Sequence, residues 1–194
     1  MTAPSFPPLM SGRAVTGATH PFDVARDLAA EGCDAGLIVH NVTANHLMAA
    51  IVLAPEVPLA EAMVMLPTCG VGFQNAFGAL APPEVAVQLE WSGGIRLNGA
   101  SCGRLREGCA EVDPVELLEA WARHSLVWIN TWEDAGSRAL HAEWRGLAWR
   151  MGQEVTQHGL TGTFQGVDER FGMLLRGPDT THLIPLTTLL ETQP

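Results

Sequence analysis

The chain has 194 residues, of which 47% are hydrophobic and 16% charged, and its formal net charge is -10 at pH 7. This composition is sufficient for a sizeable core and excludes a disordered chain. The acidic balance argues against nucleic acid or an anionic membrane surface as a partner, because both attract basic proteins. No apolar stretch approaches the roughly 18 residues of a membrane span, so none is predicted.

The four cysteines, Cys33, Cys69, Cys102 and Cys109, are scattered and form no CxxC motif. Together with a proline-rich N-terminus that lacks the signal-peptide pattern, this spacing predicts reduced thiols in a cytoplasmic protein. Cys102 and Cys109 with His124 form the one combination that could be argued as metal ligands. They do not have ligand spacing, so no metal site is predicted.

The first part of the chain is predicted to combine helices and short buried strands. Residues 20–32 have helical spacing and end at Gly32, and residues 34–41 and 48–55 have the pattern of buried strands. Residues 58–80 are apolar around much of a helical circumference. They predict one broken or two short helices on a sheet, with the break at Pro67 and at the Gly70 and Gly72 pair.

A hairpin is predicted over the next segment. Residues 84–91 alternate between apolar and polar side chains and end at Trp91, which is typical of a strand with one buried face. Asn98 and Gly99 both accept a positive φ and form the strongest short-range hairpin signal in the chain. Gly93 and Gly94 lie between the two predicted strands.

A pair of helices is predicted over residues 114–152. Asp113 suits an N-cap, Pro114 the first helical position and Glu116 the third, and Gly136 suits the end of this helix. A second helix is expected from Ser137 to Gly152. Their apolar stripes are expected to pack in the core rather than stack on a ligand: Leu118, Trp121, Ser125, Trp128 and Trp132, then Leu140, Trp144, Leu147 and Met151.

The last forty residues show short apolar stretches with turn signals every eight residues or so, which predicts a small antiparallel barrel. The fold class expected is therefore α+β, with a mixed-sheet core followed by a small β-barrel. We expect a first domain over residues 1–152, including the helical pair, and the barrel over residues 153–194.

Three stretches, in this order, resemble the biotin/lipoate protein ligase family. VQLEWSGGIRLNGASCGRL (87–105) resembles the central hairpin, in which a strand ends in Trp-Pro-Asn-Asp. VELLEAWARHSLVWINTWEDAGSRALHAEWRGLA (115–148) is similar to the helical pair of bacterial biotin ligases, and GTFQGVDERFGMLLRGPDTTHLIPL (162–186) to their C-terminal SH3-like barrel. The resemblance implies a biotin/lipoate ligase-like core followed by that barrel.

The resemblance also implies a reaction. Family members use ATP, with Mg²⁺, to convert biotin, lipoate or a related acid such as octanoate into an acyl-adenylate. They then transfer the acyl group to a lysine of a biotinyl- or lipoyl-type carrier domain. This chemistry needs cations near the α-phosphate, backbone donors close to the adenylate and an apolar slot for the acid.

Carried over by residue, the resemblance implies a ligand pocket but no complete catalytic set. Trp91 matches the family tryptophan, whereas Ser92, Gly93 and Gly94 stand where Pro-Asn-Asp would be. Ala100 stands where the family has its catalytic lysine, and no catalytic residue is assigned. The implied pocket residues are Trp91, Ser92, Gly93, Gly94, Arg96, Ala100, Gly103 and Arg106. Arg96, Arg104 and Arg106 are candidates for the missing cation, unless they are solvated surface residues.

Two further departures from the family pattern concern whole segments. The Arg/Gly-rich loop of biotin ligases is replaced by residues 41–47, which contain neither residue type. After Arg106 the chain runs almost directly to Asp113, so that the family's next core strand is either lost or omitted from this chain. Its loss would expose a sheet edge or force a different pairing, and a homodimer through such an edge is one arrangement to test.

Three hypotheses stay open at this point. The first is a divergent acyl ligase or transferase, with Cys102 as the nucleophile in one version. The second is a non-catalytic binding or regulatory protein that keeps the ligase fold, since fold is retained more readily than function. The third is an unrelated α/β domain with a barrel tail. No Walker loop, nucleophile elbow, zinc motif or dinucleotide fingerprint supports another enzyme class.

Overall fold

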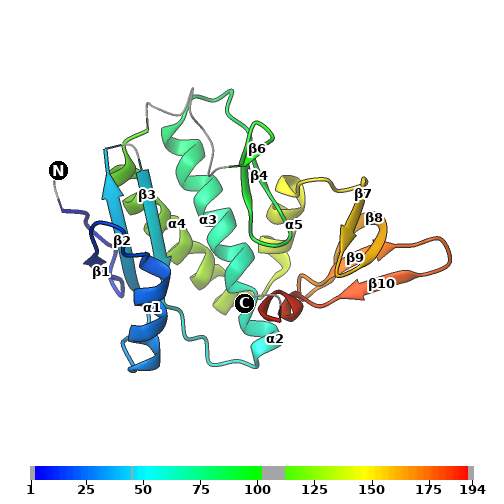
Figure 1. The fold of residues 1–194 in the computed structure, drawn as a ribbon, viewed down its shortest axis with the longest axis horizontal. Helices are drawn as coiled ribbons and strands as arrows, with labels where there is room; N and C mark the ends of the chain where they lie inside the picture. Colours follow the sequence, from blue (N-terminus) through cyan, green and yellow to red (C-terminus); the bar gives the residue numbers. More distant parts are fainter. Residues whose placement is uncertain (1–2, 45, 102–111, 192–194) are drawn as a thin grey trace.

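The computed structural model describes residues 3–44, 46–101 and 112–191, and arranges three small sheets around two long helices (Figure 1). The N-terminal sheet has the order β1-β2-β3, formed by Ser11–Ala14, Leu37–Thr43 and His46–Ile51. β1 is parallel to β2 and β2 is antiparallel to β3, which confirms the predicted mixed sheet. Helix α1 (Pro21–Ala30) connects β1 to β2 and packs on this sheet.

The central helix is continuous where a break was expected. The chain forms a short α2 (Leu59–Ala62) and then a single α3 (Met65–Leu80), so that the break lies before Pro67 and not at it. Pro67 is the third residue of α3, where a backbone N–H has no helical partner and proline costs nothing. Gly70 and Gly72 lie inside the helix, at points where other chain segments approach it closely.

Helices α3 and α4 (Pro114–Ala135) pack against each other at the centre of the molecule. A Cβ on Gly72 would lie 2.6 Å from Ser125 Oγ and 2.9 Å from Ser125 N, so only glycine permits this approach. Trp128 Nε1 donates a hydrogen bond of 2.8 Å to Asn75 Oδ1 across the same interface. Trp128 of the predicted stripe therefore packs between the two helices, as its spacing predicts.

The predicted hairpin is present as β4 (Val87–Leu89), β5 (Ile95–Leu97) and β6 (Ala100–Ser101). β4 is shorter than the expected strand over residues 84–91, and Trp91 lies in the turn after it, although its side chain is buried. Asn98 and Gly99 have φ values of 48° and 79°, as a two-residue turn with positive φ at both positions requires. Asn98 Oδ1 also accepts a hydrogen bond from the backbone N–H of Ala86.

Helix α4 begins and ends as its sequence predicts. Asp113 Oδ1 accepts hydrogen bonds from the backbone N–H groups of Val115 and Glu116, at 2.8 and 3.0 Å, and Gly136 at φ 72° terminates the helix. Helix α5 (Arg138–Leu147) ends before the expected Gly152. The residues after it leave the helix because Trp149 N donates to Leu89 O and extends the pairing of β4.

The C-terminal segment forms an antiparallel meander with the order β10-β9-β8-β7. The strands are β7 (Glu154–Gln157), β8 (Leu160–Val167), β9 (Met173–Arg176) and β10 (Thr181–Ile184). They are followed by the 3₁₀ helix η2 (Leu186–Leu190). The turn at His158 and Gly159, between β7 and β8, has positive φ at both residues. Among the described residues, β7 and β10 are the edges of this sheet.

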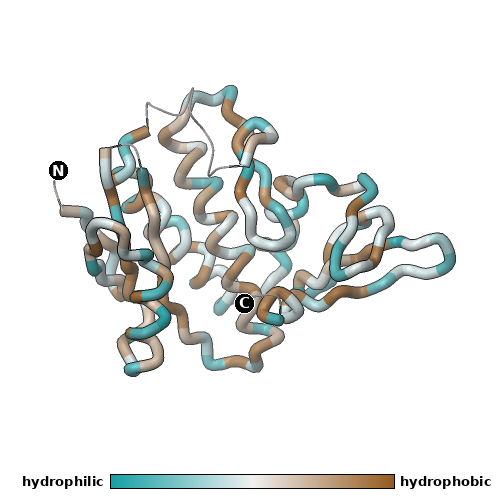
Figure 2. The backbone as a smooth tube through the Cα atoms, viewed as in Figure 1, coloured by the Kyte–Doolittle hydropathy of each residue, from teal (hydrophilic) through white to brown (hydrophobic). Residues whose placement is uncertain are grey.

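One hydrophobic cluster extends from α3 and the β4–β5 hairpin through α5 into the C-terminal sheet. Phe164, Phe171 and Leu175 of the C-terminal segment are fully buried in it. Figure 2 shows this distribution: α3 is largely hydrophobic along its length, and the tip between β9 and β10 is hydrophilic. No helix within the described ranges combines the length and apolarity needed to cross a membrane.

Candidate functional site

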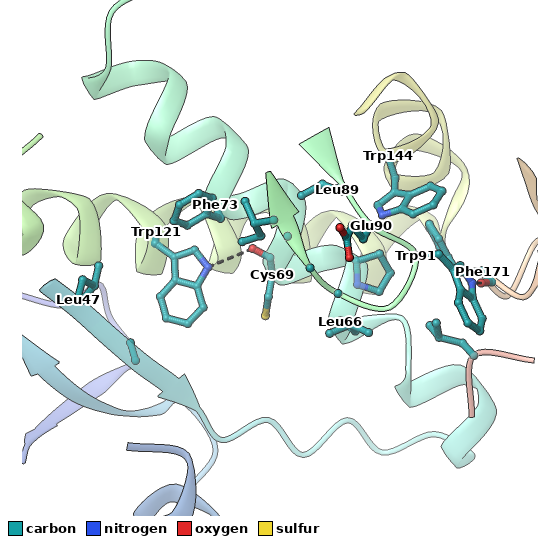
Figure 3. Close-up of a pocket in the computed structure, with 17 residues that line it drawn as sticks. Leu47, Leu66, Cys69, Phe73, Leu89, Glu90, Trp91, Trp121, Trp144 and Phe171 are labelled. Carbon is teal, nitrogen blue, oxygen red and sulfur yellow. Dashed lines mark hydrogen bonds between the residues drawn. The ribbon is translucent and has the colours of Figure 1, made fainter. Parts of the chain in front are cut away.

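A cavity of about 380 Å³ lies where β3, α3, the β4–β5 hairpin and the C-terminal segment meet (Figure 3). It is lined by Leu47, Ala49, Leu66, Pro67, Cys69, Gly70, Phe73, Leu89, Glu90, Trp91, Gly93, Gly94, Ile95, Trp121, Trp144, Phe171 and Leu186. Most of these side chains are apolar and five are aromatic. An apolar cavity of this size with few polar groups is typical of a site for a small organic ligand.

The turn between β4 and β5 forms one wall of this cavity. Gly93 N donates to Glu90 O at 3.0 Å and Glu90 N donates to Gly94 O at 2.7 Å, which closes the turn. Gly93 has a φ of 90°, and a Cβ there would lie 2.9 Å from Leu66 Cδ1 of α3. The two glycines therefore allow a tight turn to lie directly against the helix that forms the cavity floor.

Two of the three tryptophans in the wall are held by backbone carbonyls. Trp91 Nε1 donates to Phe171 O at 2.8 Å, and Trp121 Nε1 donates to Cys69 O at 3.1 Å. Trp144, on α5, packs edge-on against Phe171 at a centroid distance of 6.0 Å. These contacts fix the aromatic rings, so the apolar wall is preformed.

Glu90 is the one charged residue among the described lining residues. Its Oε1 accepts a hydrogen bond of 2.5 Å from Arg96 Nε. Arg96 Nη1 also donates to Gly99 O at 2.8 Å, and its guanidinium lies 5.0 Å from the ring centroid of Trp149. Arg96 thus has three partners and is not a lining residue.

Cys69 is the cysteine in the cavity wall. Burial raises the pKa of its thiol to about 12, because a thiolate would lose its hydration there. The thiol is therefore neutral at physiological pH, and a neutral thiol is a poor nucleophile. Cys69 contributes to the apolar wall rather than to covalent chemistry.

The structure brings together some of the residues that the resemblance implies. Trp91, Gly93 and Gly94 line the cavity, whereas Ser92 is exposed in the turn and Ala100 is exposed on β6. Gly103 and Arg106 lie outside the described residues, as do Arg104, Cys102 and Cys109. Within the described part of the chain, no three His, Cys, Asp or Glu side chains are grouped to hold a metal ion.

Sequence reasoning missed most of the cavity wall. The sequence predicts Cys69 and Phe73 only as part of an apolar helix and Pro67 and Gly70 as a break in it. It predicts Trp121 and Trp144 only as packing residues. The available signal was that α3 is apolar around most of its circumference. A helix that packs only against a sheet needs only one apolar face. Which other segment that surface would meet depends on the tertiary structure.

The basic residues add one further observation. The 194 residues contain no lysine, so all 11 basic side chains are arginines. No other lysine in the sequence can therefore take the place of the family lysine that the resemblance aligns with Ala100.

A family model described as "Biotin/lipoate A/B protein ligase family" matches residues 6–106 and 105–146. The two matched pieces overlap at residues 105–106, directly before the point where the family pattern predicts a further core strand. A second model, described as a domain of unknown function (DUF4444), matches residues 151–192. A comparison with curated proteins found no match.

Solved structures give a consistent result. A biotin protein ligase-like protein of unknown function from Silicibacter sp. TM1040 is 49% identical, with a TM-score of 0.91 over 96% of this chain and 99% of that chain. Biotin protein ligase from Aquifex aeolicus matches at 11% identity and a TM-score of 0.72, over 91% of this chain and 96% of its own. The same enzyme in complex with biotin and ATP matches at 11% identity and a TM-score of 0.67, over 90% and 95%.

The Aquifex structures, at this identity, establish the fold alone. The family model and the Silicibacter relative go further, since the first spans most of the chain and the second shares almost half of its residues. They exclude an unrelated α/β domain: the chain belongs to the biotin/lipoate A/B protein ligase family.

Proposed function

We propose that this protein binds a small, largely apolar carboxylic acid of the biotin, lipoate or octanoate class and attaches it, with ATP, to a lysine of a carrier domain. The observation that carries the proposal is the apolar cavity of about 380 Å³ against the β4–β5 hairpin, which is the segment that resembles the family's ligand-binding hairpin. Membership of the family supports the reaction. A structural relative of the same fold was solved with both biotin and ATP.

The described residues suit the acid well. Trp91, Trp121 and Phe171 offer flat apolar surfaces, and the two tryptophan rings are held in place by hydrogen bonds to backbone carbonyls. Each methylene group moved from water into such a wall contributes roughly 0.8 kcal/mol to binding. An acid with a ring or a medium-length chain is therefore the class that this cavity favours.

The same residues do not suit the triphosphate of ATP. No arginine, lysine or histidine lines the described cavity wall, and Arg96 is already bound to Glu90, Gly99 and Trp149. Phosphate transfer normally relies on cations close to the phosphates. The ATP-dependent step and its Mg²⁺ therefore rest on family membership, and Arg104 and Arg106 are the sequence candidates for the missing cation.

Two measurements test the proposal in order. Calorimetric titration of the full chain with biotin, lipoate and octanoate should show binding of at least one acid, and ATP–pyrophosphate exchange should then be seen with that acid. The variant Ala49→Phe, which places a ring in the cavity, should abolish binding while the circular dichroism spectrum stays unchanged. Failure of all three acids to bind the folded protein would refute the proposal.

Acyl transfer to a carrier domain can be measured with little labelling of this protein itself, because its sequence contains no lysine. An acyl-adenylate that leaks from the site labels mainly amines, and these 194 residues offer no lysine side chain, so the N-terminal amine is the main acceptor within this chain. Label should therefore appear on an added carrier domain, and mass spectrometry can separate the two chains. If exchange is observed, Arg106→Ala should reduce it, while Arg96→Ala should act through stability.

A second candidate function follows from the same charge pattern. A chain with no lysine and with Glu90 as the charged residue in the described wall suits a binding protein that keeps the ligase fold without its chemistry. Binding of an acid without any pyrophosphate exchange would identify this case.

A further inference from the structure

Three tryptophans line the cavity, and they differ in what their indole N–H groups do. Those of Trp91 and Trp121 donate to backbone carbonyls. The N–H of Trp144 has no hydrogen-bond acceptor among the described residues, although its side chain is only 3% exposed. The first two groups hold the fold together, and the third is left available.

The position of this N–H explains how it remains without a partner. The fully enclosed side-chain nitrogen and oxygen atoms without partners, among the described residues, are His40 Nδ1 and Ser125 Oγ. The Trp144 nitrogen is not one of them, so it has access to solvent. Trp144 lines the cavity, and Figure 3 shows its nitrogen on the ring edge turned toward the other lining side chains. The cavity is therefore the space into which it donates.

A donor in such a place favours a ligand that brings an acceptor. Water satisfies this N–H while the cavity is empty, and a ligand acceptor replaces that water with a direct hydrogen bond in a site from which water is excluded. The other groups in the wall are mostly apolar, so this N–H is one of few features that can orient a ligand.

The charge of the wall indicates which kind of acceptor fits. Glu90 lines the same cavity, and the arginine that pairs with it does not. A second carboxylate placed beside Glu90 would be repelled, because like charges in a partly desolvated site disfavour each other. A neutral carbonyl oxygen meets no such repulsion. The ligand carboxylate then belongs at the mouth of the cavity and the neutral oxygen inside it.

We propose that Trp144 Nε1–H donates a hydrogen bond to a neutral carbonyl oxygen on the body of the ligand, and that the cavity selects acids with a cyclic urea or amide. This rests on the proposed function, since it requires that the cavity binds an acid. Biotin has such an oxygen, whereas lipoate and octanoate have none. Trp144 is thus a specificity-determining residue that separates biotin-like acids from the other two.

The direct test is the indole region of the ¹H–¹⁵N spectrum of the full chain. The sequence has six tryptophans, so six indole signals are expected, and the variant Trp144→Phe identifies the one from Trp144. Saturating biotin should move this signal downfield and slow its exchange with water. Lipoate and octanoate, which bring no neutral acceptor, should not move it downfield.

Calorimetry supplies the second readout. Trp144→Phe should weaken biotin binding about 5- to 10-fold, the value of one neutral hydrogen bond, and should change octanoate binding less than about 2-fold. Trp128→Phe is the matched control, because it removes an indole hydrogen bond to Asn75 outside the cavity. If Trp144→Phe does not fold, benzothienylalanine at position 144 replaces the N–H with sulfur and keeps the ring shape.

The outcomes separate the two proposals. If none of the three acids binds, the proposed function fails and this inference fails with it. If an acid binds but octanoate or lipoate shifts the Trp144 signal as biotin does, the N–H meets the carboxylate and the inference alone is overturned. Tighter binding of octanoate than of biotin would overturn it as well.

Discussion

The indole N–H of Trp91 donates to the backbone carbonyl of Phe171 over 2.8 Å, although the two residues are 80 positions apart in the sequence. Trp91 belongs to the central hairpin and Phe171 to the loop between β8 and β9, and both line the cavity. The C-terminal segment therefore closes a wall of the cavity that the first 152 residues begin. A ligand bound there contacts both parts of the chain.

Trp91→Phe should destabilise the protein, because it removes this buried hydrogen bond and leaves Phe171 O without its donor. We expect the free energy of unfolding to fall by about 1–3 kcal/mol in urea titrations. Trp132→Phe is the control, since Trp132 is half-buried and has no indole hydrogen bond within the described residues. Equal midpoints for Trp91→Phe and the wild type would contradict the prediction.

The Glu90 and Arg96 pair should contribute to stability rather than to phosphate binding. A double-mutant cycle with Glu90→Gln and Arg96→Ala should give a coupling energy of roughly 1 kcal/mol, because both side chains are partly exposed and solvent screens the pair. Arg96→Lys should not restore full stability, since lysine lacks the fork that reaches both Glu90 and Gly99. A coupling energy of zero would show that the ion pair adds nothing.

Gly72→Ala should destabilise the packing of α3 on α4, since the added Cβ would lie 2.6 Å from Ser125 Oγ and 3.0 Å from Ser125 Cα. Overpacking of this kind costs about 1–3 kcal/mol. Gly78→Ala in the same helix is the matched control, because the nearest atom to its Cβ is at 3.7 Å. There the gain in helix propensity should stabilise the protein by up to about 1 kcal/mol. Thermal unfolding of both variants measures the contrast, and equal shifts in Tm would refute it.

Cys69 should resist alkylation in the folded protein. With the thiol pKa raised to about 12 by burial, the thiolate fraction at pH 8 is on the order of one in ten thousand. Iodoacetamide at pH 8 should leave Cys69 unmodified in native buffer and modify it in urea, as read by peptide mass spectrometry. Equal labelling in the two conditions would contradict the raised pKa of the thiol.

His40 should make the protein less stable at acidic pH. Its Nδ1 is enclosed without a hydrogen-bond partner, and burial lowers the pKa of the imidazole below 6.5. The folded state therefore favours the neutral ring, and the unfolded state binds the proton more readily. The stability contribution is complete above pH 6.5 and is lost as the pH falls from there toward the folded-state pKa, with a slope of at most about 1.4 kcal/mol per pH unit.

The variant His40→Leu tests this dependence. The difference in unfolding free energy between wild type and variant should be constant from about pH 7.5 to about pH 9. This range lies about one unit or more above the ordinary imidazole pKa, so the ring is neutral in both the folded and the unfolded state. Below pH 6.5 the wild type should lose stability faster than the variant. Parallel curves down to pH 5 would exclude His40 as a contributor.

Local features of the fold could be predicted from the sequence because their causes lie within a few residues. Asp113 and Pro114 begin α4. The side chain of Asp113 and the missing backbone N–H of Pro114 both act within the first helical turn. Asn98 and Gly99 specify their turn through their own φ preferences. The hairpin at Trp91 and the order of the three matching stretches also indicated the family, and the comparisons confirm it.

Pro67 and Arg96 show what only the tertiary structure decided. Pro67 lies in the first turn of a continuous helix because α3 begins at Met65, a boundary that no local signal marked. The sequence leaves Arg96 available as a cation. In the structure its guanidinium donates hydrogen bonds to Glu90 and Gly99 and lies over the ring of Trp149. The tryptophans differ in the same way: the helical stripes place Trp121 and Trp144 alike, yet Trp121 becomes a structural donor and Trp144 an available donor. That difference depends on whether a carbonyl from a distant segment arrives within hydrogen-bonding distance, and only the packed chain determines it.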